Sequence, residues 1–274
     1  MIVQHNMTAA NTNRQLGITT GSLAKNSEKL SSGYRINRAG DDAAGLSISE
    51  KMRGQIRGLE QASTNAQDGI SLVQTAEGAL NEVQSVLQRM RELTVQAAND
   101  TNVTADREAI AKEVHALTSE IDRIANQTEF NTMKLLSGNF TEKQLQVGAN
   151  KEQMITFSID EMTAEALAIG EVGSEIEAGD ATTITGLISV VNDAITTVST
   201  QRSALGAIQN RLEHTIANQD NTAENLQAAE SRIRDVDMAD EMVSYSKNNI
   251  LLQASQSMLA QANQSTQGVL SLLQ

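Results

Sequence analysis

The stretch that decides the fold is LEQASTNAQDGISLVQTAEGALNEVQSVLQRMRELTVQAA, residues 59–98. Two series of mostly small or apolar residues recur in it at intervals of seven. One is Leu59, Ala66, Val73, Leu80, Leu87 and Thr94; the other is Ala62, Gly69, Ala76, Val83, Met90 and Ala97. Heptad spacing places both series along one side of an α-helix, where a second helix can pack. If residues 43–98 form one helix, its length is about 80 Å at about 1.5 Å per residue.

The second half of the chain offers a matching helix. Its apolar residues again follow at intervals of seven, with Gln219 interrupting the series: Ile184, Val191, Val198, Leu205, Leu212, Leu226 and Ile233. A shorter helix is predicted after the turn at residues 99–102, with Thr104 as its N-cap and apolar residues at Ile110, Val114, Leu117, Ile121 and Ile124. We therefore predict a mainly α fold, a long antiparallel helical coiled coil formed by the N- and C-terminal halves.

The middle of the chain departs from helical spacing. Leu145 and Val147 alternate with polar neighbours, and so do Ile155, Phe157 and Ile159, with a loop between them. This alternation predicts one small central β-hairpin. Between residues 152 and 201 there is no Lys or Arg, and four glycines lie between residues 170 and 186. We expect this part to be an exposed acidic connector.

Composition excludes several classes of protein. The 274 residues contain no Cys, Pro or Trp, so disulfide scaffolds and thiolate zinc sites are excluded, and long helices meet no proline. A net charge of −13 argues against a nucleic-acid-binding surface, which needs clustered Lys and Arg. No uninterrupted apolar run reaches 18 residues, so we expect no membrane insertion. The first residues have neither a basic start nor an apolar core, so we expect no cleavable signal peptide.

The two ends of the chain are predicted to be helical arms. The expected organisation is an N-terminal arm (1–42), coiled-coil helices (43–130), the hairpin and acidic connector (131–184), a C-terminal coiled-coil helix (185–236) and a C-terminal arm (237–274). The last 27 residues contain no charged side chain, which suits a crowded protein interface. Neither arm has enough apolar residues to fold alone, so we expect both to stay disordered in the monomer. The residues predicted to contact other copies of the chain are here called the polymerisation seam. They are Leu16, Leu23, Leu30, Leu251, Met258 and Leu272.

A search for catalytic chemistry leads to no enzyme, cofactor or metal site. The spacing Asp235-x-Asp237-x-x-Asp240 resembles a calcium loop, but Ala239 replaces an oxygen ligand and no Glu stands at the twelfth position. Asp41 and Asp42 are adjacent, and we predict that one of them caps the helix that follows.

Several motifs, in order, resemble the bacterial flagellins. LSSGYRINRAGDDAAGLSISEKMR (30–53), LQRMRELTVQAAND (87–100), EIDRIANQTEFNTMKLLSG (120–138) and QVGAN (146–150) are similar to the N-terminal signature of that family. SRIRDVDMADEM (231–242) and LAQANQSTQGVLSLL (259–273) are similar to its C-terminal signature. The resemblance implies a structural subunit that polymerises with itself into the extracellular flagellar filament, used for swimming. The large outer domains of longer flagellins are missing here.

The resemblance also implies partners. These are an export chaperone on the C-terminal arm, the filament cap and hook-junction proteins, and vertebrate Toll-like receptor 5. Residues that match the family's receptor-binding motif are Arg89, Leu93 and Glu113. Residues 28–49 are similar to the peptide that plant flagellin receptors detect.

Three other interpretations remain. The nearest is a hook–filament junction protein, which shares the terminal helices. An enzyme or acidic ligand-binding module between residues 141 and 185 would be too short for an independent core. The third is an intracellular coiled-coil scaffold. Finding the protein outside the bacterium, in filaments, would argue against it.

Overall fold

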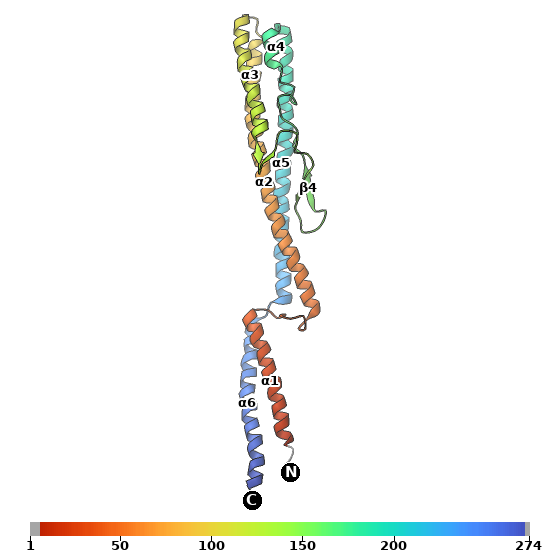
Figure 1. Ribbon diagram of the computed structural model, residues 1–274, viewed down its shortest axis with the longest axis vertical. Helices are drawn as coiled ribbons and strands as arrows, with labels where there is room; N and C mark the ends of the chain where they lie inside the picture. Colours follow the sequence, from red (N-terminus) through yellow and green to blue (C-terminus); the bar gives the residue numbers. More distant parts are fainter. Residues whose placement is uncertain (1–5, 272–274) are drawn as a thin grey trace. The chain divides into compact units, whose positions relative to one another are not determined.

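The computed structural model describes residues 6–271, and side chains for residues 6–265. The chain forms two compact units, each described here by itself. The terminal unit is Met1–Gln55 with Glu224–Gln274, and the central unit is Ile56–Ala223. The described helices are α1 (Met7–Ser32), α2 (Ala43–Ala97), α3 (Thr104–Gln127), α4 (Val172–Ala178), α5 (Ala181–Arg234) and α6 (Met238–Ser271). The strands are β1 (Glu129–Phe130), β2 (Met133–Lys134), β3 (Lys143–Gln146) and β4 (Met154–Phe157) (Figure 1). The predicted mainly α fold is confirmed.

Two adjacent aspartates, Asp41 and Asp42, precede the long helix α2 and have different roles. The Asp42 carboxylate accepts a hydrogen bond from the Gly45 N–H at 2.9 Å, so Asp42 is the predicted cap. Asp41 Oδ2 accepts instead from the N–H groups of Asn37 and Arg38, at 3.2 and 3.0 Å. The Arg38 N–H bond, above all, holds the pKa of Asp41 below its usual range. Asp41 therefore orders the loop before the helix.

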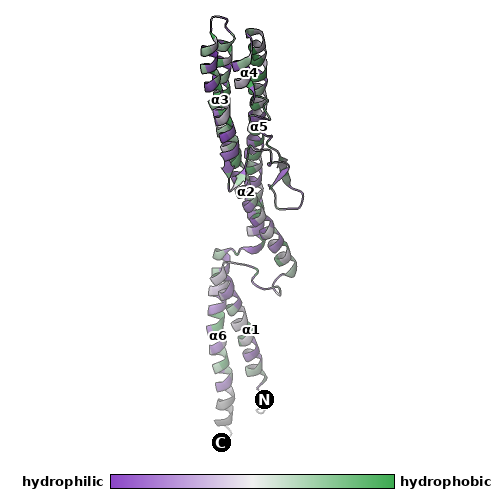
Figure 2. Cartoon of the chain, turned by 45° about the horizontal axis from the view of Figure 1, so that its top comes forward, coloured by the Kyte–Doolittle hydropathy of each residue, from purple (hydrophilic) through white to green (hydrophobic). Residues whose placement is uncertain are grey.

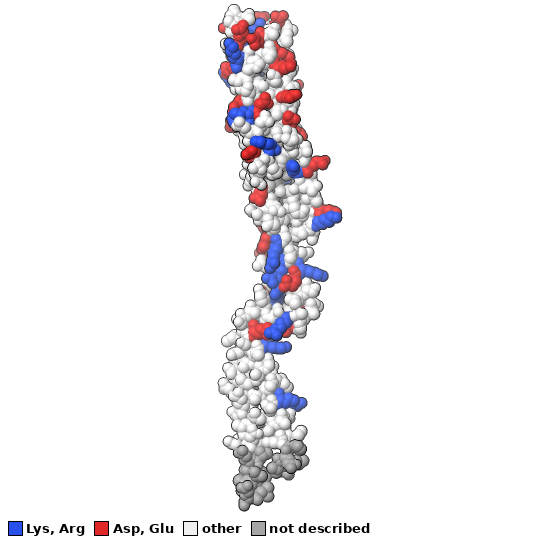
Figure 3. Space-filling model, in the orientation of Figure 1, with Lys and Arg blue, Asp and Glu red and all other residues white. Residues whose placement is uncertain are grey.

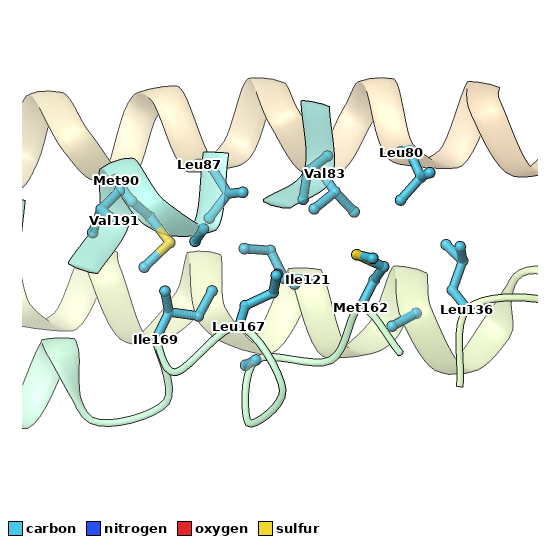
Figure 4. Packing of buried hydrophobic residues seen from close by; sticks show 14 of the residues in the cluster. Leu80, Val83, Leu87, Met90, Ile121, Leu136, Met162, Leu167, Ile169 and Val191 are labelled. Atoms are coloured by element: carbon cyan, nitrogen blue, oxygen red, sulfur yellow. The ribbon is translucent and has the colours of Figure 1, made fainter. Parts of the chain in front are cut away.

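In the central unit, α2 and α5 pack side by side and antiparallel around an apolar core (Figure 1). On each helix hydrophilic residues alternate with hydrophobic ones, as expected for helices with one buried side (Figure 2). Leu80, Val83, Leu87 and Met90 of α2 point toward Ile121 of α3 and toward Met162, Leu167 and Ile169 (Figure 4). The heptad residues predicted on α5 are also buried: Ile184, Val191, Val198, Leu205 and Leu212. The two heptad series of α2 and the α5 series as far as Leu212 thus face the core, whereas Leu226 and Ile233 are half-buried.

The helix α3 begins one residue away from the predicted cap. Val103, not Thr104, is the N-cap residue, and the Asp106 carboxylate accepts a hydrogen bond from the Val103 N–H at 3.3 Å. The prediction was wrong by one residue, and the Asp106 carboxylate binds the N–H of the N-cap residue itself, as the acidic third helical residue of a capping box does.

The predicted hairpin is confirmed as β3–β4, in which Leu145 lies opposite Ile155. Its end is attached to both long helices, because Asn65 Nδ2 of α2 donates to the Gln146 carbonyl at 3.2 Å and Gln219 Nε2 of α5 donates to the Val147 carbonyl. Gln219 is only 5 % exposed, so the residue that interrupts the heptad series serves to hold the hairpin.

A second, smaller hairpin, β1–β2, was not predicted. Its two-residue turn is formed by Asn131 and Thr132, both with positive φ, at 48° and 64°. Asn is a recognised turn residue at positive φ, but Thr is β-branched and disfavours that region. Of the two turn residues, only Asn131 is therefore a type that predicts such a turn from the sequence.

The segment predicted as an exposed acidic connector is instead part of the core. The apolar residues of this segment are buried against α2, α3 and α5: Met162, Ala164, Leu167, Ile169, Val172 and Ile176. The Ala164 N–H also donates to Asp122 of α3 at 2.8 Å. The expectation of an exposed connector was wrong. It rested on the many acidic residues of this segment and overlooked the regularly spaced apolar residues between them.

One described helix, α5, is long and apolar enough to cross a membrane by length and composition alone. Its apolar residues include Ile184, Val191 and Val198, which are fully buried in the central core. Packing within the protein buries 28 % of the most apolar 18-residue window of this helix.

The buried connector leads to the first prediction. Ile169→Ala should lower the free energy of unfolding by about 2–5 kcal/mol, because Ile169 is fully buried in the core. Glu165→Ala, at an exposed position of the same segment, should change it by less than about 0.5 kcal/mol. Urea unfolding followed by circular dichroism measures both values. Equal, small effects would mean that the segment is not part of the core.

Candidate assembly and recognition surfaces

In the terminal unit, α1 and α6 lie side by side (Figure 1). The Asn6 carbonyl oxygen Oδ1 caps α1 by accepting from the Ala9 N–H at 3.0 Å, and Asn6 Nδ2 donates across to the Ala262 carbonyl of α6 at 3.0 Å. At the other end Gly33, with φ of 75°, terminates α1 and donates its N–H to the Lys29 carbonyl at 2.8 Å. Residues about 250 positions apart in the sequence are thus brought together.

Polar residues alternate with leucines along the buried side of α1. Its buried and half-buried residues, three or four apart, are Ala9, Thr12, Leu16, Thr19, Leu23, Asn26 and Leu30. The corresponding residues of α6 are Glu241, Tyr245, Asn248, Leu252, Ser255, Leu259 and Ala262. A contact surface of this composition buries little apolar area, so it stabilises the helix pair weakly.

A polar cluster lies between the two helices near Asn26. With its amide oriented to satisfy its neighbours, Asn26 donates to Glu241 Oε1 and accepts from Asn248 Nδ2, both at 3.0 Å. Lys29 Nζ lies 3.6 Å from Glu241 Oε2. Hydrogen bonds in a half-buried site set the register of two helices at some cost in stability.

The six residues of the predicted polymerisation seam are not brought together. Leu16, Leu23 and Leu30 are half-buried between α1 and α6 of the same chain. Leu251 and Met258 lie on another side of α6 and are 44 % and 61 % exposed. Leu272 lies outside the described residues. One position along a helix is a rotation of about 100°, so Leu252 and Leu259 are half-buried, whereas Leu251 and Met258 lie at the exposed edge of the helix pair.

The terminal unit exposes many large apolar side chains. These are Met7 and Ile18 of α1, Ile48 of α2, and Met238, Met242, Val243, Ile250, Leu251 and Met258 of α6. Most of the surface of α1 and α6 in view carries no charge (Figure 3). Of the charged residues, ten basic and ten acidic belong to the terminal unit, so the whole net charge of −13 belongs to the central unit. A surface with no net charge and this many exposed apolar residues is typical of an interaction site.

A short backbone pairing joins the two halves of the terminal unit. The Arg35 N–H donates to the Arg234 carbonyl at 2.7 Å, and the Val236 N–H donates to the Gly33 carbonyl at 3.1 Å. The Arg234 guanidinium pairs with Glu50 at 2.6 Å and lies 4.8 Å from the centre of the Tyr34 ring. The sequence gave no periodic signal for these contacts, because they join the loop after α1 to the C-terminal end of α5 and the residues that follow it.

In the central unit, two of the three predicted receptor-binding residues form an exposed ion pair. Arg89 Nη2 of α2 lies 2.9 Å from Glu113 Oε1 of α3, and Arg89 Nη1 lies 3.0 Å from Glu92. The hydrogen bond to Glu113, and then that to Glu92, raises the pKa of Arg89. The side chains of Arg89 and Glu113 are 50 % and 46 % exposed. Leu93 is only 2 % exposed and lies in the core, so it supports this surface from below.

The carboxylates that resemble a calcium loop begin a helix. Asp237 Oδ1 accepts hydrogen bonds from the N–H groups of Ala239 and Asp240, at 2.9 and 3.3 Å, at the start of α6. In the described part of the chain, no three His, Cys, Asp or Glu side chains gather in a way that could hold a metal ion.

Comparison with known proteins identifies the family. The bacterial flagellin N-terminal helical region matches residues 3–141, and the bacterial flagellin C-terminal helical region matches residues 188–273. This chain belongs to the bacterial flagellin family. It is 57 % identical to a flagellin of Halalkalibacterium halodurans over 273 residues, and 53 % identical to the flagellar filament 33 kDa core protein of Treponema phagedenis over 285 residues, each covering all of both chains. Flagellin is a structural protein rather than an enzyme, and the chain is a subunit of the extracellular flagellar filament.

The fold is shared more widely than the sequence. A putative flagellar hook-associated protein of Vibrio parahaemolyticus has a similar structure, with a TM-score of 0.61 over 71 % of this flagellin and all of that chain, but only 14 % identity. That similarity concerns the fold alone. The hook–filament junction interpretation therefore has much weaker support than the flagellin interpretation.

The exposed ion pair and the buried leucine beside it lead to the second prediction. Arg89→Ala should change the free energy of unfolding by less than about 1 kcal/mol, because exposed ion pairs contribute little. Leu93→Ala should lower it by about 2–5 kcal/mol, because the side chain is buried. Thermal and urea unfolding of the two variants test this, and a large loss in Arg89→Ala would refute it.

Proposed function

We propose that this flagellin polymerises with copies of itself through the exposed sides of α1 and α6, and that the filament so formed serves swimming motility. The observation that carries the proposal is the exposed apolar stripe on α6, in which Val243 is 69 % exposed, Ile250 67 % and Met258 61 %. Burial of such side chains contributes about 25 cal/mol per Å². Growth without closure requires a head-to-tail contact whose rotation forms no ring.

Weak pairing within the subunit supports ordering of the arms during assembly. Fixing the backbone costs about 1–2 kcal/mol per residue, and the half-polar contact between α1 and α6 offsets only part of that cost. We infer that the arms, disordered in the monomer, become ordered when neighbouring subunits cover their exposed sides. In the disordered state the C-terminal arm would be bound by an export chaperone, and the ordered arms would also contact the filament cap and hook-junction proteins.

The third prediction tests the α6 stripe. A subunit with both Ile250→Ser and Leu251→Ser should elongate seed filaments at least about tenfold more slowly, because burying each aliphatic side chain contributes about 1.5–3 kcal/mol. The helix content of the monomer should not change, since both side chains are exposed. Val103→Ser, at a position 62 % exposed in the central unit, is the control and should elongate normally. Light scattering and electron microscopy give the rates, and normal elongation by the double variant would disprove the proposal.

We further propose that Toll-like receptor 5 contacts the surface around Arg89 and Glu113. The structure supports this because residues 24 positions apart, on α2 and α3, lie together in one exposed pair. Leu93 beneath them would keep the backbone of α2 in place rather than contact the receptor.

The fourth prediction separates this surface from other exposed charges. Arg89→Ala and Glu113→Ala should each weaken receptor binding about tenfold, the loss typical of a charged hydrogen bond at an interface. Arg123→Ala is the matched control, because Arg123 of α3 is similarly exposed and pairs with Glu120. Surface plasmon resonance with the receptor ectodomain measures the affinities. Unchanged affinity in the two test variants, or an equal loss in the control, would place the contact elsewhere.

A further inference from the structure

Four of the nine large apolar side chains that are exposed in the described part of the terminal unit are methionines. Met7 is 74 % exposed, Met258 61 %, Met242 50 % and Met238 48 %. By contrast, Met90 and Met162 of the central core are 0 % and 1 % exposed. The chain has no Cys and no Trp, so thioethers are its most readily oxidised side chains.

Two of these methionines share one groove between α1 and α6. The groove has a volume of about 600 Å³ and is lined by Met7, Thr8, Asn11, Thr12, Gln15, Leu251, Ala254, Ser255 and Met258. None of these residues is charged, and Leu251 and Met258 belong to the stripe assigned above to assembly. In the ordered arms, the groove is therefore part of the surface that polymerisation would cover, and Met7 and Met258 are exposed along it.

We propose that Met7 and Met258 form an oxidation-sensitive site that controls assembly, with hypochlorite or a peroxide as the oxidant. An oxygen atom passes from hypochlorous acid to the methionine sulfur, which is oxidised by two electrons to the sulfoxide. The chlorine is reduced from +1 to −1 and leaves as chloride, and a proton is released. With hydrogen peroxide the other product is water.

Sulfoxide formation makes polar two of the four apolar side chains that line the groove. A sulfoxide oxygen is a strong hydrogen-bond acceptor, and the groove offers it only the hydroxyl and amide groups already present on its walls. Covering that oxygen with an apolar neighbour costs free energy. An oxidised subunit should therefore bind poorly to the next subunit at this contact. A methionine sulfoxide reductase would reduce the two sulfoxides and restore the ability to assemble.

This inference rests on the proposed polymerisation through α1 and α6. The experiment therefore has one readout that depends on assembly and one that does not. Purified subunits are treated with increasing hypochlorite, and peptide mass spectrometry gives the order in which the methionines are oxidised. The same samples are then offered to seed filaments, and elongation is measured by light scattering.

We expect Met7 and Met258 to be oxidised before Met90 and Met162, and elongation to fall at least about tenfold when both carry sulfoxide. The double variant Met7→Leu with Met258→Leu keeps the apolar volume and should elongate normally before and after treatment. Met133→Leu removes a methionine that is 40 % exposed in the central unit, and this control should be inhibited like the unsubstituted chain.

Equal elongation by subunits with and without the two sulfoxides would overturn the inference and leave the proposed polymerisation intact. Equal inhibition of the Met7→Leu, Met258→Leu variant would also overturn it, since another residue would then be responsible. Failure of untreated subunits to elongate seeds would overturn the proposed function and this inference together.

Discussion

Burial of small and aliphatic side chains between α2 and α5 is the interaction on which the central unit depends. The chain has only two Tyr and three Phe, so large aromatic burials cannot supply its core. Instead, residues such as Leu80 and Leu205 repeat along two long helices, and α3, α4 and the buried connector pack against that pair. The position of α3 follows from this packing, and with it the meeting of Glu113 with Arg89. The recognition surface is thus a consequence of the core beneath it.

The terminal unit is built on a different balance. Along the buried side of α1, Leu23 is followed by Asn26, and Leu16 by Thr19, so polar groups occupy every second contact. Hydrogen bonds such as that between Asn26 and Glu241 specify how α1 and α6 pair without stabilising the pair strongly. The two units also differ in net charge. The terminal unit has none, whereas the central unit carries the entire excess of 13 negative charges. Close approach of copies is electrostatically least unfavourable at the arms.

Periodicity predicted most of the fold because α2 and α5 repeat their pattern over many turns. The hairpin β3–β4 was also predicted, since Leu145 and Ile155 alternate with polar neighbours. The connector was missed because a run of acidic residues hid the spacing of Met162 and Ile169, whose burial depends on helices far away in the sequence. Similarly, the pairing of Arg35 with Arg234 joins segments 199 positions apart, and no local pattern encodes such a contact. The motif around Arg89 predicted that Arg89, Leu93 and Glu113 form a receptor-binding surface. That Leu93 is buried in the core follows only from the packing of the helices.

The offset between the two leucine series on α6 explains why the predicted seam divides. Leu252 and Leu259 are half-buried beside α1, Leu251 and Met258 lie exposed at the groove along the edge of the helix pair, and Ile250 is exposed. A helix that is apolar on opposite sides is stable only when both sides are covered, and a single partner helix covers one. A charged outer side would have ended association at the helix pair, but residues 248–274 contain no charge. The composition of α6 therefore favours further copies of the same subunit as the partners that cover its second side.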